Sequence, residues 1–305
     1  MKMPTHVSRQ PLSGLLLPAL LSLSAQVHAA TFNVTEEACS AAPGGYEWAL
    51  QQANSTPGRD TISIDIPVFR VDCGRLTTEP DLPTPITESV DIVGNGNLVN
   101  GNLFYIDQSG GVNNPTVCPD FNSGAKFVNY GGALLQVGDR DDPDGNDSVE
   151  VTVTNFRTTR LTRFAYVHAN AKLTVDNVEI KRTSGVTSAG QCNLATITAD
   201  PGAEVTLTNT TITETAIPLS GRNPIVGLEF LAAVIVGQDA LLNMDNVKIT
   251  NTFGDVAGAV LWGRKNQAAN VRIVNSEFQR SGGFFIGGSI VRFVNSTYPV
   301  SYTHL

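Results

Sequence analysis

The segments Leu173-Thr174-Val175-Asp176-Asn177 and Val205-Thr206-Leu207-Thr208-Asn209 decide the fold of this chain. In both, apolar and polar residues alternate, and an asparagine follows. Alternation with a period of two is typical of a strand that buries one face. The same five-residue pattern recurs along the chain. Each copy ends at an asparagine: Asn155, Asn177, Asn209, Asn246, Asn275 and Asn295. The sequence therefore predicts one repeated strand with an asparagine at its end.

A second short apolar strand precedes each copy. The predicted second strands are Ala133–Leu135, Ala165–Val167, Ala195–Ile197, Ala233–Ile235, Ala259–Leu261 and Phe284–Ile286. The steps between the asparagines (155→177→209→246→275→295) are 22, 32, 37, 29 and 20 residues. A core period near 20 with insertions of variable length indicates stacked coils, because loops can lengthen without disturbing the stack. We expect an all-β, single-stranded parallel solenoid.

We expect the six asparagines to line up in one column along the stacked coils and to have a structural role. In stacked coils, equivalent side chains lie about 4.8 Å apart, so amides can hydrogen-bond to the coils above and below. Asn209 and Asn295 also match the N-glycosylation pattern, but we expect the stacking to bury them. Outward positions place opposite charges on neighbouring coils, which predicts surface ion pairs. The predicted pairs are Arg157 with Glu179, Lys248 with Glu277, and Arg182 with Glu214.

Residues 88–298 resemble the right-handed parallel β-helix superfamily with the pectate-lyase-like fold. The region before them is similar to the CSLREA-type segment that opens many secreted bacterial β-helix proteins. The similarity lies in Cys39-Ser40, in Glu47–Asn54 and in Pro57–Ile62. Six residues, Ala41–Tyr46, separate Cys39-Ser40 from Glu47 here, and the arginine of that family's pattern is absent. Residues 46–54 predict a short helix that covers the first coil, with Trp48 and Leu50 buried.

The resemblance implies several activities, because the superfamily includes polysaccharide lyases, glycoside hydrolases and noncatalytic adhesins. The Trp-x-Asp-His, Arg-x-Pro-x-x-Arg and Gly-His-Gly motifs of its enzymes do not occur in this sequence. Asp176 and Asp245 are expected two coils apart, about 10 Å, which is marginal for an inverting carboxylate pair. His168 is expected in a turn, with no serine or cysteine nucleophile pattern near it.

Composition narrows the class of protein. The 305 residues carry a net charge of −8, and only 16% of them are charged. With 41% hydrophobic residues the chain is ordered, and its acidic balance makes nucleic acid an unlikely partner. Residues 1–29 match a secretory signal peptide, with Lys2 and Arg9 before the apolar run Pro11–Ala25 and small residues at the cleavage site. We expect a secreted, periplasmic or cell-surface protein with no transmembrane segment in the mature chain.

Four cysteines in an exported chain suggest disulfides, since no spacing here fits a zinc site. Three connectivities are open for Cys39, Cys73, Cys118 and Cys192. Cys118 and Cys192 fall in insertions about two coils apart. We therefore predict that they pair and that Cys39 pairs with Cys73.

An acidic loop is the richest local feature of the sequence. Its carboxylates are Asp139, Asp141, Asp142, Asp144 and Asp147. Alternating oxygen ligands in a glycine-containing loop are typical of calcium sites, but Pro143 interrupts that spacing. Two interpretations stay open: a solvated turn, and a calcium site that stiffens the turn. No other cofactor is expected.

The insertions 108–128, 182–193 and 214–230 all follow an asparagine-containing strand, so they should project from one side. Candidate ligand contacts there are Asp120, Arg182, Arg222 and Glu229. We expect a cap region with a short helix and the first strands at 30–87, the β-helix at 88–298 and a tail at 299–305 that ends within a coil, as in a fragment. The leading hypothesis is a binding or adhesive module for glycans. The alternative is a polysaccharide lyase or glycoside hydrolase with its site on these insertions.

Overall fold

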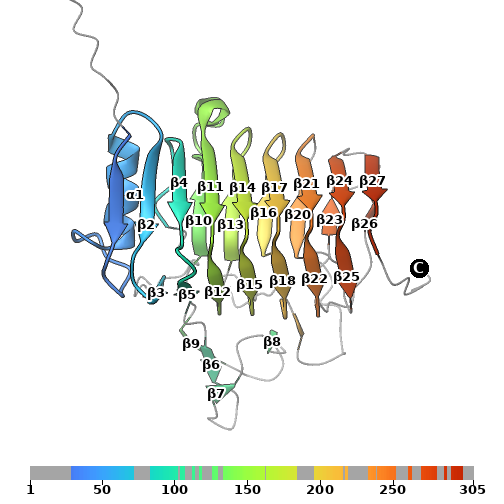
Figure 1. The fold of residues 1–305 in the computed structure, drawn as a ribbon, viewed down its shortest axis with the longest axis horizontal. Coiled ribbons are helices and arrows are strands. Elements are labelled where there is room, and N and C mark those ends of the chain that lie inside the picture. Colours follow the sequence, from blue (N-terminus) through green and yellow to red (C-terminus); the bar gives the residue numbers. More distant parts are fainter. Residues whose placement is uncertain are drawn as a thin grey trace, which may run out of the picture.

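The structure is a computed structural model of the chain. It describes residues 29–71, 83–101, 104–106, 112–113, 117–118, 126–129, 133–161, 163–183, 196–215, 217–218, 233–237, 239–251, 260–262, 269–279, 285–286 and 290–297. The described part is mostly β-strand with one α-helix, and its three large sheets are parallel (Figure 1).

The largest sheet has nine parallel strands, stacked in the order in which the chain forms them. It contains the strands with the apolar–polar alternation. Its strands are β1 (Thr31–Val34), β2 (Asp60–Ile64), β4 (Val90–Val93), β11 (Glu150–Thr154), β14 (Lys172–Asp176), β17 (Glu204–Thr208), β21 (Leu241–Asp245), β24 (Asn270–Val274) and β27 (Ile290–Val294). β1 and β2 lie within residues 30–87 and are the first strands of this sheet.

Two further parallel sheets accompany it. The six-stranded sheet contains β10 (Ala133–Val137), β13 (Arg163–Val167), β16 (Ile197–Ala199), β20 (Val234–Val236), β23 (Val260–Trp262) and β26 (Phe285–Ile286). The seven-stranded sheet contains β3 (Val68–Arg70), β5 (Leu98–Asn100), β12 (Arg157–Thr159), β15 (Glu179–Lys181), β18 (Thr211–Thr213), β22 (Lys248–Thr250) and β25 (Glu277–Gln279). From β10 onward the chain passes through the six-, nine- and seven-stranded sheets in turn. We call each level of the stack a rung, including the earlier levels that contain β1, β2 and β4.

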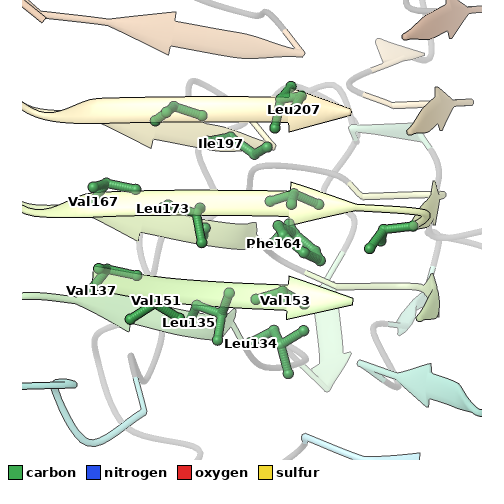
Figure 2. Close-up of a cluster of buried hydrophobic side chains, with 14 of the residues drawn as sticks. Leu134, Leu135, Val137, Val151, Val153, Phe164, Val167, Leu173, Ile197 and Leu207 are labelled. Atoms are coloured by element: carbon green, nitrogen blue, oxygen red, sulfur yellow. The ribbon is translucent and has the colours of Figure 1, made fainter. Parts of the chain in front are cut away.

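The register of the strands builds the core. Val151 of β11 pairs with Leu173 of β14, which pairs with Val205 of β17. All three side chains are buried. Figure 2 shows such side chains from facing strands meeting between the sheets, with Val153 on one side and Leu135 on the other. Alternation thus places one face of each strand in a continuous column and stabilises the stack by burial of apolar surface.

From β11 onward, each strand of the nine-stranded sheet is followed directly by an asparagine with a left-handed backbone conformation. The φ angles of Asn155, Asn177 and Asn209 are 58°, 54° and 49°. Asparagine tolerates this region better than most residues. The residue after each of the first five of these asparagines is buried, for example Phe156 and Val178. The turn therefore needs only two residues to lead the chain from one sheet to the next.

The asparagine side chains are exposed, which corrects the expectation that stacking would bury them. Part of the predicted hydrogen bonding occurs: Asn177 Nδ2 donates to Asn155 Oδ1 at 2.6 Å, and Asn246 Nδ2 donates to Asn209 Oδ1 at 2.8 Å. Asn209 Nδ2 donates instead to Asp176 Oδ1 at 2.8 Å. The amides point away from the core because buried residues that follow them, such as Phe156 and Val178, fill the interior.

The helix α1 (Tyr46–Ser55) lies at the β1 end of the stack (Figure 1). Leu50 and Tyr46 are buried, and the Tyr46 hydroxyl donates to the Leu134 carbonyl oxygen at 3.1 Å. Burial raises the pKa of Tyr46 far above its usual value. Trp48 is only partly buried and packs edge-on against Phe32, with ring centroids 5.9 Å apart. The helix covers the apolar end of the first rungs, where Leu50 is buried as expected and Trp48 is less so.

Short strands lie outside the three large sheets. β8 (Val117–Cys118) pairs in parallel with β19 (Ile217–Pro218). β6 (Phe104–Ile106) pairs in antiparallel fashion with β7 (Val112–Asn113) and β9 (Lys126–Asn129). They belong to segments that follow the seven-stranded sheet, and Figure 1 shows them to one side of the stack.

Candidate functional site

An open groove of about 560 Å³ follows the corner between the nine- and seven-stranded sheets. We call it the corner groove. It crosses four rungs, and its lining residues are Asn95, Gly96, Asn155, Phe156, Arg157, Asn177, Val178, Glu179, Asn209 and Thr211. The tight asparagine turns create it, because two sheets meet there at an angle without an intervening loop. Such a groove suits an elongated ligand that lies along the stack.

Amides provide much of the polar surface of this groove. The Asn155 Oδ1 atom accepts from Asn177. Among the described residues, the Asn155 Nδ2 atom has no acceptor and the Asn177 Oδ1 atom has no donor. The buried side chains of Phe156 and Val178 support the groove from below. The groove thus offers amide donors and acceptors to a ligand rather than an aromatic platform.

A second polar cluster lies on the six-stranded sheet. We call it the Asp200 network; its members are Gln136, Arg163, Tyr166, His168 and Asp200. The Tyr166 hydroxyl donates to Asp200 Oδ1 at 2.8 Å, and His168 Nδ1 lies 3.2 Å from Asp200 Oδ2. The Gln136 amide nitrogen lies 3.0 Å from His168 Nε2. The guanidinium carbon of Arg163 is 4.8 Å from the centre of the Tyr166 ring.

The chemistry of this network favours stability over catalysis. His168 is only 3% exposed, and both of its ring nitrogens have partners, so neither is available to a substrate. Burial, with the Asp200 charge, raises the pKa of Tyr166 to about 12, so the phenol stays protonated. Burial lowers the pKa of Arg163 to about 10, and the side chain remains cationic at neutral pH. The network satisfies buried polar groups across neighbouring rungs.

The sequence placed His168 in a turn but missed its partner. It predicted a strand at Ala195–Ile197, whereas β16 begins at Ile197 and pairs Ala199 with Val167. This register brings Asp200 beside His168. A usable signal was present in the two turns His168-Ala169-Asn170-Ala171 and Asp200-Pro201-Gly202-Ala203. In both turns the third residue has a left-handed backbone conformation, and the fourth residue is a buried alanine. Aligning the two turns therefore gives the observed register.

The acidic loop forms a turn with a short 3₁₀-helix, Gly145–Ser148. The buried Asn146 organises it: the Asp139 backbone nitrogen donates to Asn146 Oδ1 at 2.7 Å, and Asn146 Nδ2 donates to the Asp139 carbonyl at 2.8 Å. Asp142 Oδ1 accepts from the Gly145 backbone nitrogen at 3.1 Å. Asp141 and Asp144 are exposed.

Calcium binding by this loop stays a prediction. In the part of the chain that the structure describes, no three His, Cys, Asp or Glu side chains gather as a group that could hold a metal ion. The Asp147 side chain is outside that part.

The other predicted site residues are not brought into one place. Arg182 Nε donates to Glu214 Oε2 at 2.9 Å, as the predicted ion pair requires. Asp176 and Asp245 lie on either side of Thr208 in neighbouring strands, and the Thr208 hydroxyl donates to Asp176. Asp120, Arg222 and Glu229 lie outside the described residues.

The structure describes the side chain of one of the four cysteines. Cys39 is disulfide-bonded. Cys73, Cys192 and the Cys118 side chain lie outside the described residues, so the pairings Cys39–Cys73 and Cys118–Cys192 stay predictions.

No protein-family model matches the chain, and no curated protein matches it either. In the described residues there is no helix of the length and apolar character needed to cross a membrane.

Proposed function

We propose that this chain is an exported, right-handed parallel β-helix protein of the pectate-lyase-like kind, with a CSLREA-type N-terminal region, that binds extracellular glycans. Three strands per rung in three parallel sheets support the β-helix. Crossovers between parallel strands of one sheet are almost always right-handed, which supports the handedness. The pattern of residues 1–29 supports export to the periplasm, the cell surface or the medium.

The corner groove is the observation that carries the glycan proposal. It is open, it crosses four rungs, and exposed amides line it. A sugar is about as long as one rung spacing and presents hydroxyls that both donate and accept hydrogen bonds. Successive sugars of a linear glycan can therefore meet successive rungs, with amide groups as partners.

The test is binding of the purified protein to a glycan array, followed by calorimetry with the glycans that bind. A Thr211→Trp variant fills the groove with an indole. A Thr213→Trp variant is the matched control, since both threonines belong to β18 and face outward, but only Thr211 lines the groove. We expect the Thr211 variant to lose binding by at least about tenfold and the control to keep it.

Two results would contradict the proposal. One is the absence of binding to any glycan. The other is conversion of a polysaccharide, with or without calcium, to unsaturated products or new reducing ends, which would make the chain a lyase or hydrolase instead of a binding module.

A further inference from the structure

Two opposite charges face the corner groove from neighbouring rungs. Arg157 of β12 and Glu179 of β15 are paired in register, so their backbones are one strand spacing apart, about 4.8 Å. Both side chains are exposed, and both line the groove. No ion pair joins these two described residues. Further along the same column, Lys248 and Glu277 do form one, with 3.1 Å between Nζ and Oε2.

A backbone contact accounts for the difference. Arg157 Nε donates to the Gly96 carbonyl oxygen at 3.0 Å, which turns the guanidinium toward the preceding rung and away from Glu179. Within the described part of the chain, the two Nη nitrogens of Arg157 have no acceptor and the Glu179 carboxylate has no donor. Both charged groups are therefore held at the groove with their ligand-binding atoms facing water.

The two groups favour different parts of a ligand. A guanidinium with two free nitrogens matches a carboxylate, which it can bind through two parallel hydrogen bonds. A glutamate carboxylate accepts hydrogen bonds from hydroxyls and repels a second carboxylate. Because the groups are one rung apart, a chain lying along the groove meets them with successive sugars.

We propose that the corner groove selects glycans in which an acidic sugar alternates with a neutral one. The acidic sugar places its carboxylate on Arg157, and the next sugar places hydroxyls on Glu179. This inference rests on the proposed function and assigns a substrate class to the same groove. A homopolymer of acidic sugars brings a carboxylate against Glu179, and a neutral glycan leaves Arg157 without an anion, so both bind more weakly.

The experiment compares three probes by calorimetry at low ionic strength. Hyaluronan oligosaccharides alternate glucuronate with N-acetylglucosamine, oligogalacturonates are acidic throughout, and cello-oligosaccharides are neutral. We expect the alternating probe to bind at least about fivefold more tightly than the other two, because each exposed charge contributes about 1 kcal/mol. Added salt should reduce this preference.

Two variants separate the roles of the charges. Glu179→Gln should raise affinity for oligogalacturonate about fivefold, and Arg157→Gln should remove the preference for the alternating probe over the neutral one. Glu277→Gln is the matched control, since it removes a carboxylate from the same column outside the groove. It should change neither affinity.

The outcomes distinguish this inference from the proposed function. Equal affinity for all three probes, or tighter binding of oligogalacturonate, overturns the inference; if Thr211→Trp still abolishes binding, the glycan-binding groove stands. Binding of none of the probes or of any arrayed glycan overturns both.

Discussion

Thr158 is a polar residue at an inward-facing position of the core. Thr158 belongs to the inward column of the seven-stranded sheet, where its register neighbours are Val99 and Ile180. It is 2% exposed, and its hydroxyl has no hydrogen-bond partner. A buried hydroxyl without a partner costs free energy that an apolar group of similar shape does not.

Thr158→Val should therefore stabilise the protein. We expect the free energy of unfolding to rise by about 1 kcal/mol, because valine replaces the unpaired hydroxyl by a methyl group in an apolar column. Urea unfolding measures the change. The control is Thr174→Val on the outer, half-buried face of β14, for which we expect little change. A Thr158→Val protein that is no more stable than the native chain would contradict the argument.

Ion pairs connect residues at the ends of strands in neighbouring rungs. Lys181 and Arg182 both contact Glu214 of the next rung, with closest distances of 3.3 Å and 2.9 Å. Partial burial acts to raise the pKa of the Glu214 carboxyl, but the hydrogen bonds and charges of Arg182 and Lys181 outweigh it, and the net pKa is lowered. The folded state thus favours the ionised carboxylate.

The lowered pKa gives a pH dependence with a defined sign. Because the folded pKa lies below its ordinary value of 4.5, the contribution is present above that pH and is lost as pH falls through the folded pKa. Glu214→Gln should cost about 1 kcal/mol or less at neutral pH, and the difference from the native chain should shrink as pH falls below 4.5. Urea unfolding across this range measures it. A difference that stays constant with pH would contradict the assignment.

Across the residues that the structure describes, the two ends of the stack differ. At one end α1 covers the first rungs and buries Leu50 together with Ile62. At the other end β27 is the last strand of the nine-stranded sheet, and its Phe293 is 47% exposed, although Ile273, its register neighbour, is buried. A cover over the end of a stack of parallel strands hides apolar surface and strand edges, which otherwise favour association.

Removing the helical cover should test its role. Leu50→Asp places a charge in the apolar contact between α1 and the first rungs, so we expect the free energy of unfolding to fall by at least about 3 kcal/mol. Exposure of the first rungs should also increase aggregation. The control is Gln51→Asp, which introduces the same residue at the neighbouring, exposed position of α1. Thermal unfolding and light scattering measure the two effects; equal behaviour of the two variants would show that α1 does not protect the stack.

Much of this architecture can be predicted from local sequence. The alternation in segments such as Val205–Asn209 identifies the strands of the nine-stranded sheet, because side-chain direction along a strand depends only on position. The asparagines mark the turns because their backbone tolerates a positive φ. The helix at residues 46–54 was also predictable, since it begins and ends within a short segment.

Which side chains meet across rungs was decided by the tertiary structure. The pairing of His168 with Asp200 depends on the register of β13 with β16, and a shift of two residues keeps the same faces inward, so alternation cannot detect it. The exposure of the asparagines depends on how Phe156 and its equivalents fill the corner. The groove beside Arg157 and Glu179 exists only because successive turns stack in space. The sequence by itself determined the strands and turns, whose causes are local, and the packing of rungs determined the contacts, whose partners lie many residues apart.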